Sequence, residues 1–308
     1  MEDKKRVLVA GDIMIDNYVY VTSNRIASEA KIPVWDVVKQ ERRLGGAANV
    51  AHNLKILGVN DVEVYLSGIV DERDRKIIEN IGINTILCSS GSTMRKDRFV
   101  DDNMKYVLRC DNFKSFDQNR IDVFKRMLSF FLSAEIHKFD AIIFSDYDKG
   151  TLNAQIVDLI VKSCSPGFIV VDSKRLDLSM FKGSLVLKIN EFEYSRQVSK
   201  APYVNVESLF TNVVVTKGKD GAELRQMLKS IKDSHKNVVS ANDERYITLT
   251  ENFPSLSVAT SDVTGCGDTH TAAMTFSLLA HDDLRMAIRF ANECSRKVVQ
   301  KFGTSVPT

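Results

Sequence analysis

The sequence predicts an α/β protein whose mostly parallel central sheet carries helices on both faces, with a smaller β-sheet standing off the body as a lid. Short apolar runs alternate along the chain with stretches of helical spacing, which is the order that parallel sheets produce. Additional strand-like segments interrupt this alternation and indicate a second sheet. Polar or glycine-containing stretches follow successive strands, where the ligand crevice of an open α/β sheet lies.

The strands of the main sheet are expected where short apolar runs are bounded by polar residues or glycine. These runs are residues 7–11, 62–69, 140–144, 168–171, 185–189 and 213–215. Helical spacing is found at residues 47–57, 73–81, 120–136, 152–163 and 271–280. The first two of these helices are followed by Gly58 and Gly82, and glycine is common immediately after a helix.

The lid strands are expected at about residues 17–39 and 94–110. Residues 17–21 and 34–39 alternate apolar and polar side chains, and residues 95–100 and 105–110 form a hairpin around the polar turn 101–103. We expect the whole chain, residues 1–308, to be one domain that includes this lid. Residues 225–245 are the most polar section and are expected to form an exposed excursion.

Composition excludes several classes of protein. The chain has 308 residues, of which 44% are hydrophobic, and its net charge is only +2, so it has no strong field for nucleic acid or an anionic membrane. Its five cysteines are scattered without a C-x-x-C pair, which predicts neither a zinc site nor a disulfide framework. The first residues lack the pattern of a signal peptide, and no apolar run is long enough to span a bilayer. We therefore expect a cytoplasmic protein.

The most informative stretch is residues 262–269, in which Gly265 and Gly267 precede Asp268 at the start of a helix. Glycines let backbone N–H groups turn toward one point, and the helix N-terminus adds a positive dipole end, so the stretch can hold an anion. A carboxylate beside an anion is electrostatically unfavourable unless it has a catalytic function. Taking the proton from a hydroxyl that attacks a phosphoryl group would be such a function. Taken alone, the stretch is equally compatible with a loop and a helix capped by Asp268 or Thr269.

Polar groups at the ends of other strands are expected to converge on the same edge of the sheet. Each stretch alone could be an ordinary turn, but their repetition along one chain argues for a shared site. These stretches are residues 11–16, 43–49, 145–150, 171–174, 189–193 and 216–221.

From residue 7 to residue 304 the sequence resembles the ribokinase-like (PfkB) carbohydrate kinase family. Residues 45–49, Gly-Gly-Ala-Ala-Asn, and residues 262–268 match the two signature regions of that family. Within it, the chain is most similar to heptose 7-phosphate kinases, including the kinase half of the bifunctional heptose kinase/adenylyltransferase. The residues behind that narrower similarity lie at 11–16, 25–34, 145–150 and 301–305. The resemblance implies a three-layer sandwich with a β-sheet lid.

The resemblance also implies roles for individual residues. Asp268 would be the general base, and the anion hole for the transferred phosphoryl group would use the N–H groups of Gly265, Cys266 and Gly267. The sugar would be held by Asp16, Gly45, Gly46 and Asn49. The nucleotide would be held by Asn190, Thr216, Gly218, Gly221 and Asn292, and Glu193 would organise Mg²⁺. Lys149 and Lys174 would bind phosphates, the first on the substrate and the second on the nucleotide, if they are not ordinary surface lysines.

Other interpretations of these residues stay open at this point. Asp16 could cap a turn, Asn49 could cap a helix, and Glu193 could be a solvated helix residue. Cys266 could be a nucleophile, although a small side chain whose N–H is used is the better interpretation, and a helix N-terminus would lower its thiol pKa.

The resemblance implies an ATP- and Mg²⁺-dependent kinase that phosphorylates a sugar or sugar phosphate. The favoured substrate is D-glycero-D-manno-heptose 7-phosphate, which would give the 1,7-bisphosphate. A kinase for another sugar, sugar phosphate or nucleoside is one alternative, and a silent sugar or nucleotide sensor is another. We expect a homodimer formed through the β-lid, and no nucleic-acid or membrane partner.

Overall fold

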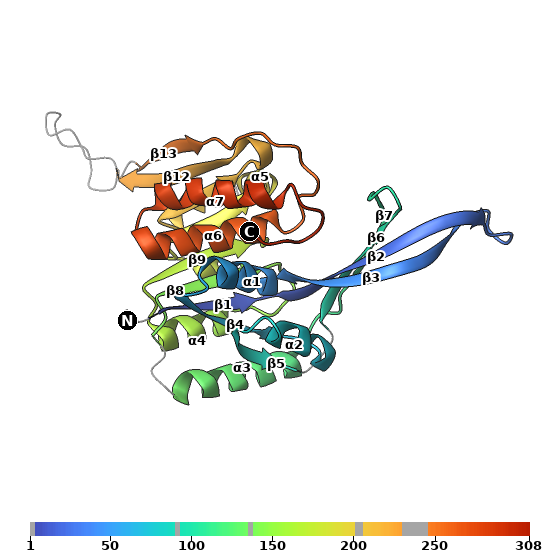
Figure 1. The fold of residues 1–308 in the computed structure, drawn as a ribbon. Coiled ribbons are helices and arrows are strands. Elements are labelled where there is room, and N and C mark those ends of the chain that lie inside the picture. Colours follow the sequence, from blue (N-terminus) through green and yellow to red (C-terminus); the bar gives the residue numbers. More distant parts are fainter. Residues whose placement is uncertain (1–3, 90–92, 135–137, 201–205, 230–245) are drawn as a thin grey trace, which may run out of the picture.

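The computed structural model describes residues 4–89, 93–134, 138–200, 206–229 and 246–308. Its larger sheet has the strand order β13-β12-β11-β10-β9-β8-β1-β4-β5 (Figure 1). All neighbours are parallel except β11–β12 and β12–β13, which are antiparallel. The strands are β1 (Lys5–Gly11), β4 (Val62–Ile69), β5 (Asn84–Cys88), β8 (Ala141–Asp146), β9 (Phe168–Ser173), β10 (Val186–Asn190), β11 (Asn212–Thr216), β12 (Ala222–Lys229) and β13 (Tyr246–Phe253). The predicted α/β class is confirmed.

Helices cover both faces of this sheet, because the buried strands carry apolar side chains on both sides. In β1, Leu8 faces the core beneath α3, α4 and α5, whereas Val9 faces the core beneath α1 and α2, which α6 and α7 extend. The α-helices are α1 (Ala47–Leu57), α2 (Glu72–Glu79), α3 (Gln118–Ala134), α4 (Ala154–Cys164), α5 (Glu191–Lys200), α6 (Cys266–His281) and α7 (Leu284–Val298). Short 3-10 turns are η1 (Ser179–Phe181), η2 (Val206–Ser208) and η3 (Gly218–Asp220). Within the described ranges, no helix combines the length and apolar character needed to cross a bilayer.

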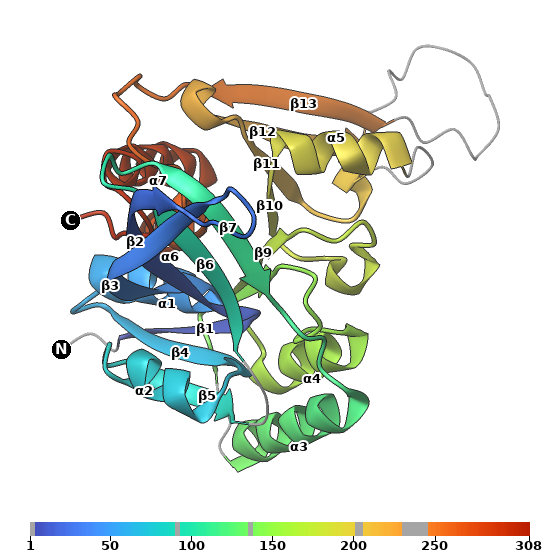
Figure 2. The same cartoon turned by 90° about the vertical axis from the view of Figure 1, so that its right-hand side faces the viewer.

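A second sheet, which we call the lid, projects from one edge of the body (Figures 1 and 2). Its strand order is β3-β2-β6-β7, in which β2 and β6 are parallel and the other pairs are antiparallel. The strands are β2 (Ile13–Ile26), β3 (Pro33–Gly46), β6 (Met94–Val100) and β7 (Tyr106–Asn112). Strands β2 and β3 extend at both ends beyond the lid segments that the alternating pattern predicts. Only Asp12 therefore separates β1 from β2, and β3 leads directly into α1.

The sequence pattern misses the strands at both edges of the large sheet. The expectation of an exposed excursion from residue 225 is wrong for its first part, because β12 pairs with β11 there and Arg225 forms ion pairs with Glu207 and Glu223. An edge hairpin with a polar face has no continuous apolar run, so it does not resemble the buried strands. Residues 230–245 of that stretch lie outside the described residues.

The junction between β3 and α1 depends on Gly46. Its φ of 56° is in the left-handed region, and a Cβ added there would lie 2.3 Å from the backbone oxygen of Asp12. The Ala47 N–H donates to the same oxygen at 2.9 Å. Residue 46 must therefore be glycine for the lid strand to turn into the helix against the end of β1.

Gly46→Ala should lower the free energy of unfolding by more than the roughly 1–2 kcal/mol that a left-handed alanine costs by itself, because the new Cβ also meets a backbone oxygen. Gly82→Ala is the matched control, since Gly82 has a φ of 69° and an added Cβ would have nothing within 4 Å. Urea unfolding measures both variants. Equal losses in the two would contradict the close contact with Asp12.

Candidate active site

A cavity of about 400 Å³ lies at the carboxyl ends of the central strands, beside the N-terminus of α6. Most of the predicted nucleotide and anion-hole residues line it, although they come from distant parts of the chain. These residues are Lys174, Asn190, Thr216, Gly218, Gly221, Gly265, Cys266, Gly267, Asp268 and Asn292. The convergence of strand ends on one edge is thus observed for this group.

Asp268 lies in the first turn of α6 and is 4% exposed. Its Oδ2 accepts a hydrogen bond from Asn49 Nδ2 at 2.9 Å, and its Oδ1 accepts one from the Tyr147 hydroxyl at 2.6 Å. Burial raises the pKa of Asp268, whereas these two hydrogen bonds lower it. A fixed carboxylate with a raised pKa is suited to accept a proton from a neighbouring hydroxyl.

Two of the three backbone N–H groups predicted to form an anion hole are free, whereas the third is not. In the described part of the chain, the N–H groups of Gly265 and Gly267 have no hydrogen-bond acceptor, so both are free to meet an anion. The Cys266 N–H, predicted as a third donor, instead donates to the Val263 carbonyl at 3.2 Å. Burial raises the pKa of the Cys266 thiol, which corrects the expected lowering by the helix N-terminus and argues against a nucleophilic role.

A buried ion pair that the sequence analysis did not identify lies beneath the anion hole. Lys188 Nζ is 2.8 Å from Asp172 Oδ2, which also accepts a hydrogen bond from the Thr271 hydroxyl at 3.0 Å. A Cβ added at Gly267 would lie 3.0 Å from the same ammonium. A positive charge is therefore held against the first turn of α6, where it adds to the field of the helix N-terminus.

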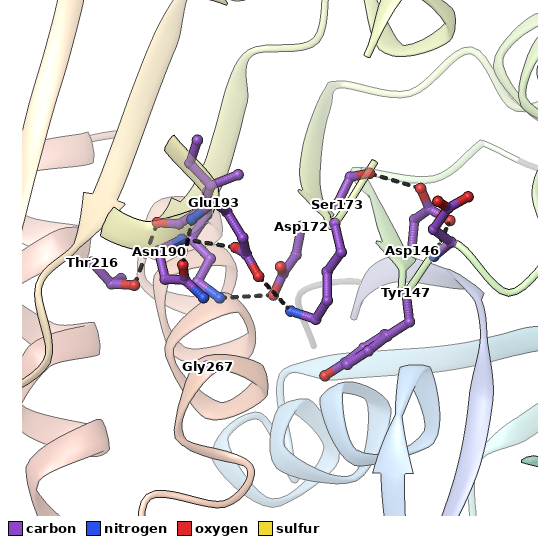
Figure 3. A network of polar contacts seen from close by, with 12 residues as sticks. Asp146, Tyr147, Asp172, Ser173, Asn190, Glu193, Thr216 and Gly267 are labelled. Atoms are coloured by element: carbon purple, nitrogen blue, oxygen red, sulfur yellow. Dashed lines mark hydrogen bonds and ion pairs between the residues drawn. The ribbon is translucent and has the colours of Figure 1, made fainter. Parts of the chain in front are cut away.

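The predicted metal and nucleotide residues Asn190 and Glu193 form a reciprocal helix cap (Figure 3). The Asn190 N–H donates to Glu193 Oε2 at 2.9 Å, and the Glu193 N–H donates to Asn190 Oδ1 at 2.8 Å. Lys174 Nζ is 3.0 Å from Glu193 Oε1. Both residues therefore cap α5, and the open interpretation of Glu193 as a solvated residue is wrong, since it is buried and paired.

Asn292 lies on the far side of the cavity, on α7. Its Nδ2 donates to the Phe253 carbonyl at 2.9 Å, and its Oδ1 is 3.2 Å from His270 Nε2. Burial, followed by the charge of Lys188, lowers the pKa of His270 to about 3, so the imidazole is neutral at ordinary pH. These contacts fix the amide of Asn292 at the cavity wall.

The predicted sugar residues come together at the base of the lid. Asp16 forms an ion pair with Arg98 of β6, and a Cβ added at Gly45 would lie 2.5 Å from Asp16 Oδ2. Asn49 extends the group to Asp268 through its side-chain amide. Asp16 therefore does not simply cap a turn, because its partner lies on another strand.

Lys149 lies outside the cavity that the predicted nucleotide residues line, and its Nζ is 5.2 Å from the centre of the Phe113 ring. Its expected role on a substrate phosphate stays a prediction. A second cation near the sugar residues, besides Arg98, is Lys96, which is opposite Asp16 in the register of β2 and β6. In the described ranges Lys96 has no ion-pair partner, and burial lowers its pKa while Asp16 and Asp268 raise it.

The lid also contacts the loop that precedes the anion hole. The Tyr106 hydroxyl on β7 donates to Asp262, and the Tyr106 ring stacks on Phe302 with the ring centres 5.3 Å apart. Asp262 accepts further hydrogen bonds from Thr264 and from the Gly303 N–H. The sugar side and the anion-hole loop are therefore connected through one carboxylate.

The model of the family described as pfkB family carbohydrate kinase matches residues 4–308, which include this cavity and the lid. The chain belongs to the pfkB family. Relatives agree with this assignment. The bifunctional protein HldE of Aliarcobacter butzleri is 31% identical over 321 residues, covering 100% of this chain and 63% of the relative. HldE of Sulfurimonas denitrificans is 30% identical, covering 97% of this chain and 62% of the relative. The chain thus spans less than two thirds of the length of these relatives.

Solved structures of pfkB-type proteins confirm the ribokinase-like fold. Ribokinase from Thermotoga maritima superposes with a TM-score of 0.68 at 17% identity, covering 98% of this chain and 95% of that one. Phosphofructokinase-2 from Escherichia coli, in complex with potassium, gives a TM-score of 0.69 at 15% identity, covering 98% and 94%.

Several residues of this pfkB-family site were missed in the sequence. Lys188 interrupts the apolar run 185–189, and a charged residue inside a buried strand is a signal for a buried partner. Tyr147 lies inside the stretch 145–150 that was linked to the heptose kinases, but no role was assigned to it. Lys96 and Arg98 alternate along a strand like ordinary surface residues, so only the sheet register reveals them.

Lys188→Met should lower the free energy of unfolding by about 3–5 kcal/mol, because it leaves the Asp172 carboxylate buried without its cation. Burial raises the pKa of Asp172, but the charges of Lys188 and Lys174, together with hydrogen bonds from Lys188 and Thr271, lower it below its usual value. The pair therefore stabilises the fold above the unfolded pKa of Asp172 and loses this effect as the pH falls. The deficit of the variant, measured by urea unfolding, should be largest near neutral pH and shrink in acid.

Two controls accompany this measurement. Lys162→Met removes a lysine from an exposed ion pair with Asp158 at 2.9 Å and should change stability by less than about 1 kcal/mol. Adding Asp172→Asn to Lys188→Met should recover much of the loss. A pH-independent deficit would contradict the assignment of the charge pair.

Proposed function

We propose that this chain transfers the γ-phosphoryl group of ATP to a hydroxyl of a sugar or sugar phosphate. The observation that carries the proposal is Asp268, a buried carboxylate in the first turn of a helix beside the free N–H groups of Gly265 and Gly267. Asp268 would take the proton of the attacking hydroxyl, and the N–H groups would stabilise the charge on the transferred group. Family membership supports this chemistry.

ATP would lie in the cavity, with its phosphates directed toward the N-terminus of α6. Lys174 and Lys188 line that cavity and would offset the charge of the phosphates. The residues present also fit Mg²⁺, which prefers oxygen ligands and keeps most of its waters. Within the described residues Asp172 Oδ1 is buried without a hydrogen-bond partner, so Asp172 and Glu193 would hold the ion and its waters. Bound Mg²⁺ would neutralise charge on the ATP phosphates.

The sugar would lie between the lid and Asp268, in contact with Asp16, Gly45, Gly46 and Asn49. Among the described residues Lys96 has no ion-pair partner, so the site would favour a substrate that carries an anionic group. D-glycero-D-manno-heptose 7-phosphate meets this requirement, and the similarity to proteins named bifunctional HldE supports it. The product would be the 1,7-bisphosphate. Because the reaction consumes ATP, we place it in the cytoplasm.

Asp268→Asn should lower kcat by roughly 10²–10⁴-fold while substrate binding is largely kept, because the amide preserves the shape of the side chain but cannot accept the proton. ADP release from ATP and Mg²⁺ would be measured with a panel of sugars, sugar phosphates and nucleosides. The panel includes the heptose 7-phosphate and its unphosphorylated heptose.

The outcomes of this panel separate the alternatives. Turnover of the heptose phosphate only would establish the substrate, and turnover of another sugar would keep the kinase mechanism and reject the heptose. ATP binding without turnover of any acceptor would favour a sensor. Turnover by Asp268→Asn near that of the wild type would reject the role of Asp268.

We also propose that two copies of the chain associate through the lid. The lid exposes large apolar side chains, including Val38 at 66% on β3 and Leu108 at 54% on β7. Trp35 on β3 is 39% exposed beside them. Burial of such a surface against a second copy would be favourable in proportion to the apolar area removed from water.

Val38→Lys combined with Leu108→Lys should convert the dimer to a monomer, because two charges would be buried at the interface. Sedimentation velocity over a range of concentrations measures the state. Phe130→Lys is the control, since Phe130 is 78% exposed on α3, away from the lid. A wild-type chain that sediments as a monomer at all concentrations would reject the proposed dimer.

A further inference from the structure

The hydroxyl of Tyr147 donates to Oδ1 of the proposed general base, Asp268, at 2.6 Å. Asn49 occupies Oδ2 of the same carboxylate. Each carboxylate oxygen therefore already accepts one hydrogen bond from the protein, and the two donors come from different elements, α1 and the loop after β8. Proton abstraction from a sugar needs one of these oxygens within hydrogen-bond reach of the sugar hydroxyl.

Tyr147 is held firmly at the carboxyl end of β8, next to Asp146 (Figure 3). Its backbone N–H donates to the buried carboxylate of Asp12 at 2.8 Å. Two ammonium groups lie over its ring, with Lys174 Nζ 4.5 Å and Lys96 Nζ 5.0 Å from the ring centre. Cations over the face of an aromatic ring attract it, so both lysines help to hold the ring in place.

The two lysines around the ring belong to different halves of the site. Lys174 pairs with Glu193 on the nucleotide side, whereas Lys96 belongs to lid strand β6. An anionic group of a bound sugar would pair with Lys96 and weaken its hold on the ring. The environment of Tyr147 would therefore change when the sugar site fills.

We propose that Tyr147 is a positioning residue whose hydroxyl holds Asp268 Oδ1 until a sugar hydroxyl takes over that oxygen. This inference rests on the proposed kinase function, and it adds a means of limiting ATP hydrolysis when no sugar is bound. While Tyr147 donates to Oδ1, a water molecule has less access to the base, so ATP is protected from hydrolysis in the absence of sugar.

The replacement of the Tyr147 hydroxyl by a sugar hydroxyl at Asp268 Oδ1 is consistent with the proton balance of phosphoryl transfer. The sugar hydroxyl gives its proton to Asp268 Oδ1 as its oxygen bonds to the γ-phosphorus and the bond between that phosphorus and the ADP oxygen breaks. Tyr147 loses no proton in this step. Burial, and then the charge of Asp268, raise the pKa of Tyr147 well above its usual value, so the phenol stays neutral and acts only as a donor.

Tyr147→Phe tests the proposal because it removes the hydroxyl and keeps the ring beside the two lysines. ATP hydrolysis without sugar, relative to sugar-dependent ADP release, should rise about tenfold or more, since a hydrogen bond to a charged group is lost. The acidic limb of the pH profile of kcat/KM should move to higher pH, because the lost bond lowers the pKa of Asp268 in the wild type.

The matched control is Tyr194→Phe, which removes another phenol hydroxyl that donates to a carboxylate, Glu207, at 2.7 Å. Tyr194 does not line the cavity, so this variant should show neither the increase in hydrolysis nor the shift of the acidic limb. Sugar affinity, measured by calorimetry, should change little in Tyr147→Phe. Loss of sugar binding with an unchanged acidic limb would overturn the proposal and make Tyr147 a sugar ligand.

A measurement without turnover separates this proposal from the proposed function. The stability deficit of Tyr147→Phe in urea should grow as the pH rises through the raised pKa of Asp268, because the bond stabilises only the ionised carboxylate. In an Asp268→Asn background that growth should vanish. A deficit independent of pH in both backgrounds would overturn the proposal even if the wild type phosphorylates sugars. The expected pH dependence without any turnover would reject only the kinase function.

Discussion

The site depends on the buried carboxylate of Asp12, at the end of the first strand. It accepts backbone hydrogen bonds from Tyr147 at 2.8 Å, Lys149 at 3.1 Å and Thr151 at 3.2 Å, and so shapes the loop after β8. The backbone oxygen of Asp12 also accepts the N–H of Ala47, the first residue of α1. Burial raises the pKa of this carboxyl, as does the charge of the neighbouring Asp146. One residue thus places both partners of the proposed base, because Tyr147 lies on the loop and Asn49 on α1.

The charged side chains of the cavity are also paired within the protein. The negative groups Asp172 and Glu193 are each paired with a lysine, and those ammonium groups lie where phosphates would bind. A site that must admit a highly charged ligand is stable without it only if its own charges are balanced. Each lysine therefore has a protein partner that compensates its charge when the site is empty.

The fold and the local motifs could be predicted from the sequence, whereas most side-chain pairings could not. The glycines around Asp268 act through backbone geometry within a few residues, so the order of residues is sufficient to identify them. The contact between Tyr147 and Asp268 joins positions 121 residues apart, and only the assembled sheet brings them together. Lys149 is a second example. It follows Asp148, whose φ of 57° turns the chain, and its side chain lies against Phe113, a contact that the order of residues does not reveal.

The continuity of the lid strands with the body has a mechanical consequence. A single residue, Asp12, separates β1 from β2, and β3 runs into α1 without an intervening loop. The lid is therefore joined to the body at Gly11 and Gly46 without a long loop at either position. A movement of the lid would be a rotation about these two residues. Swinging it outward would pull on the helix that carries Asn49 and disengage that amide from Asp268. The lid movement that releases the product would then also break the hydrogen bond that orients the proposed base.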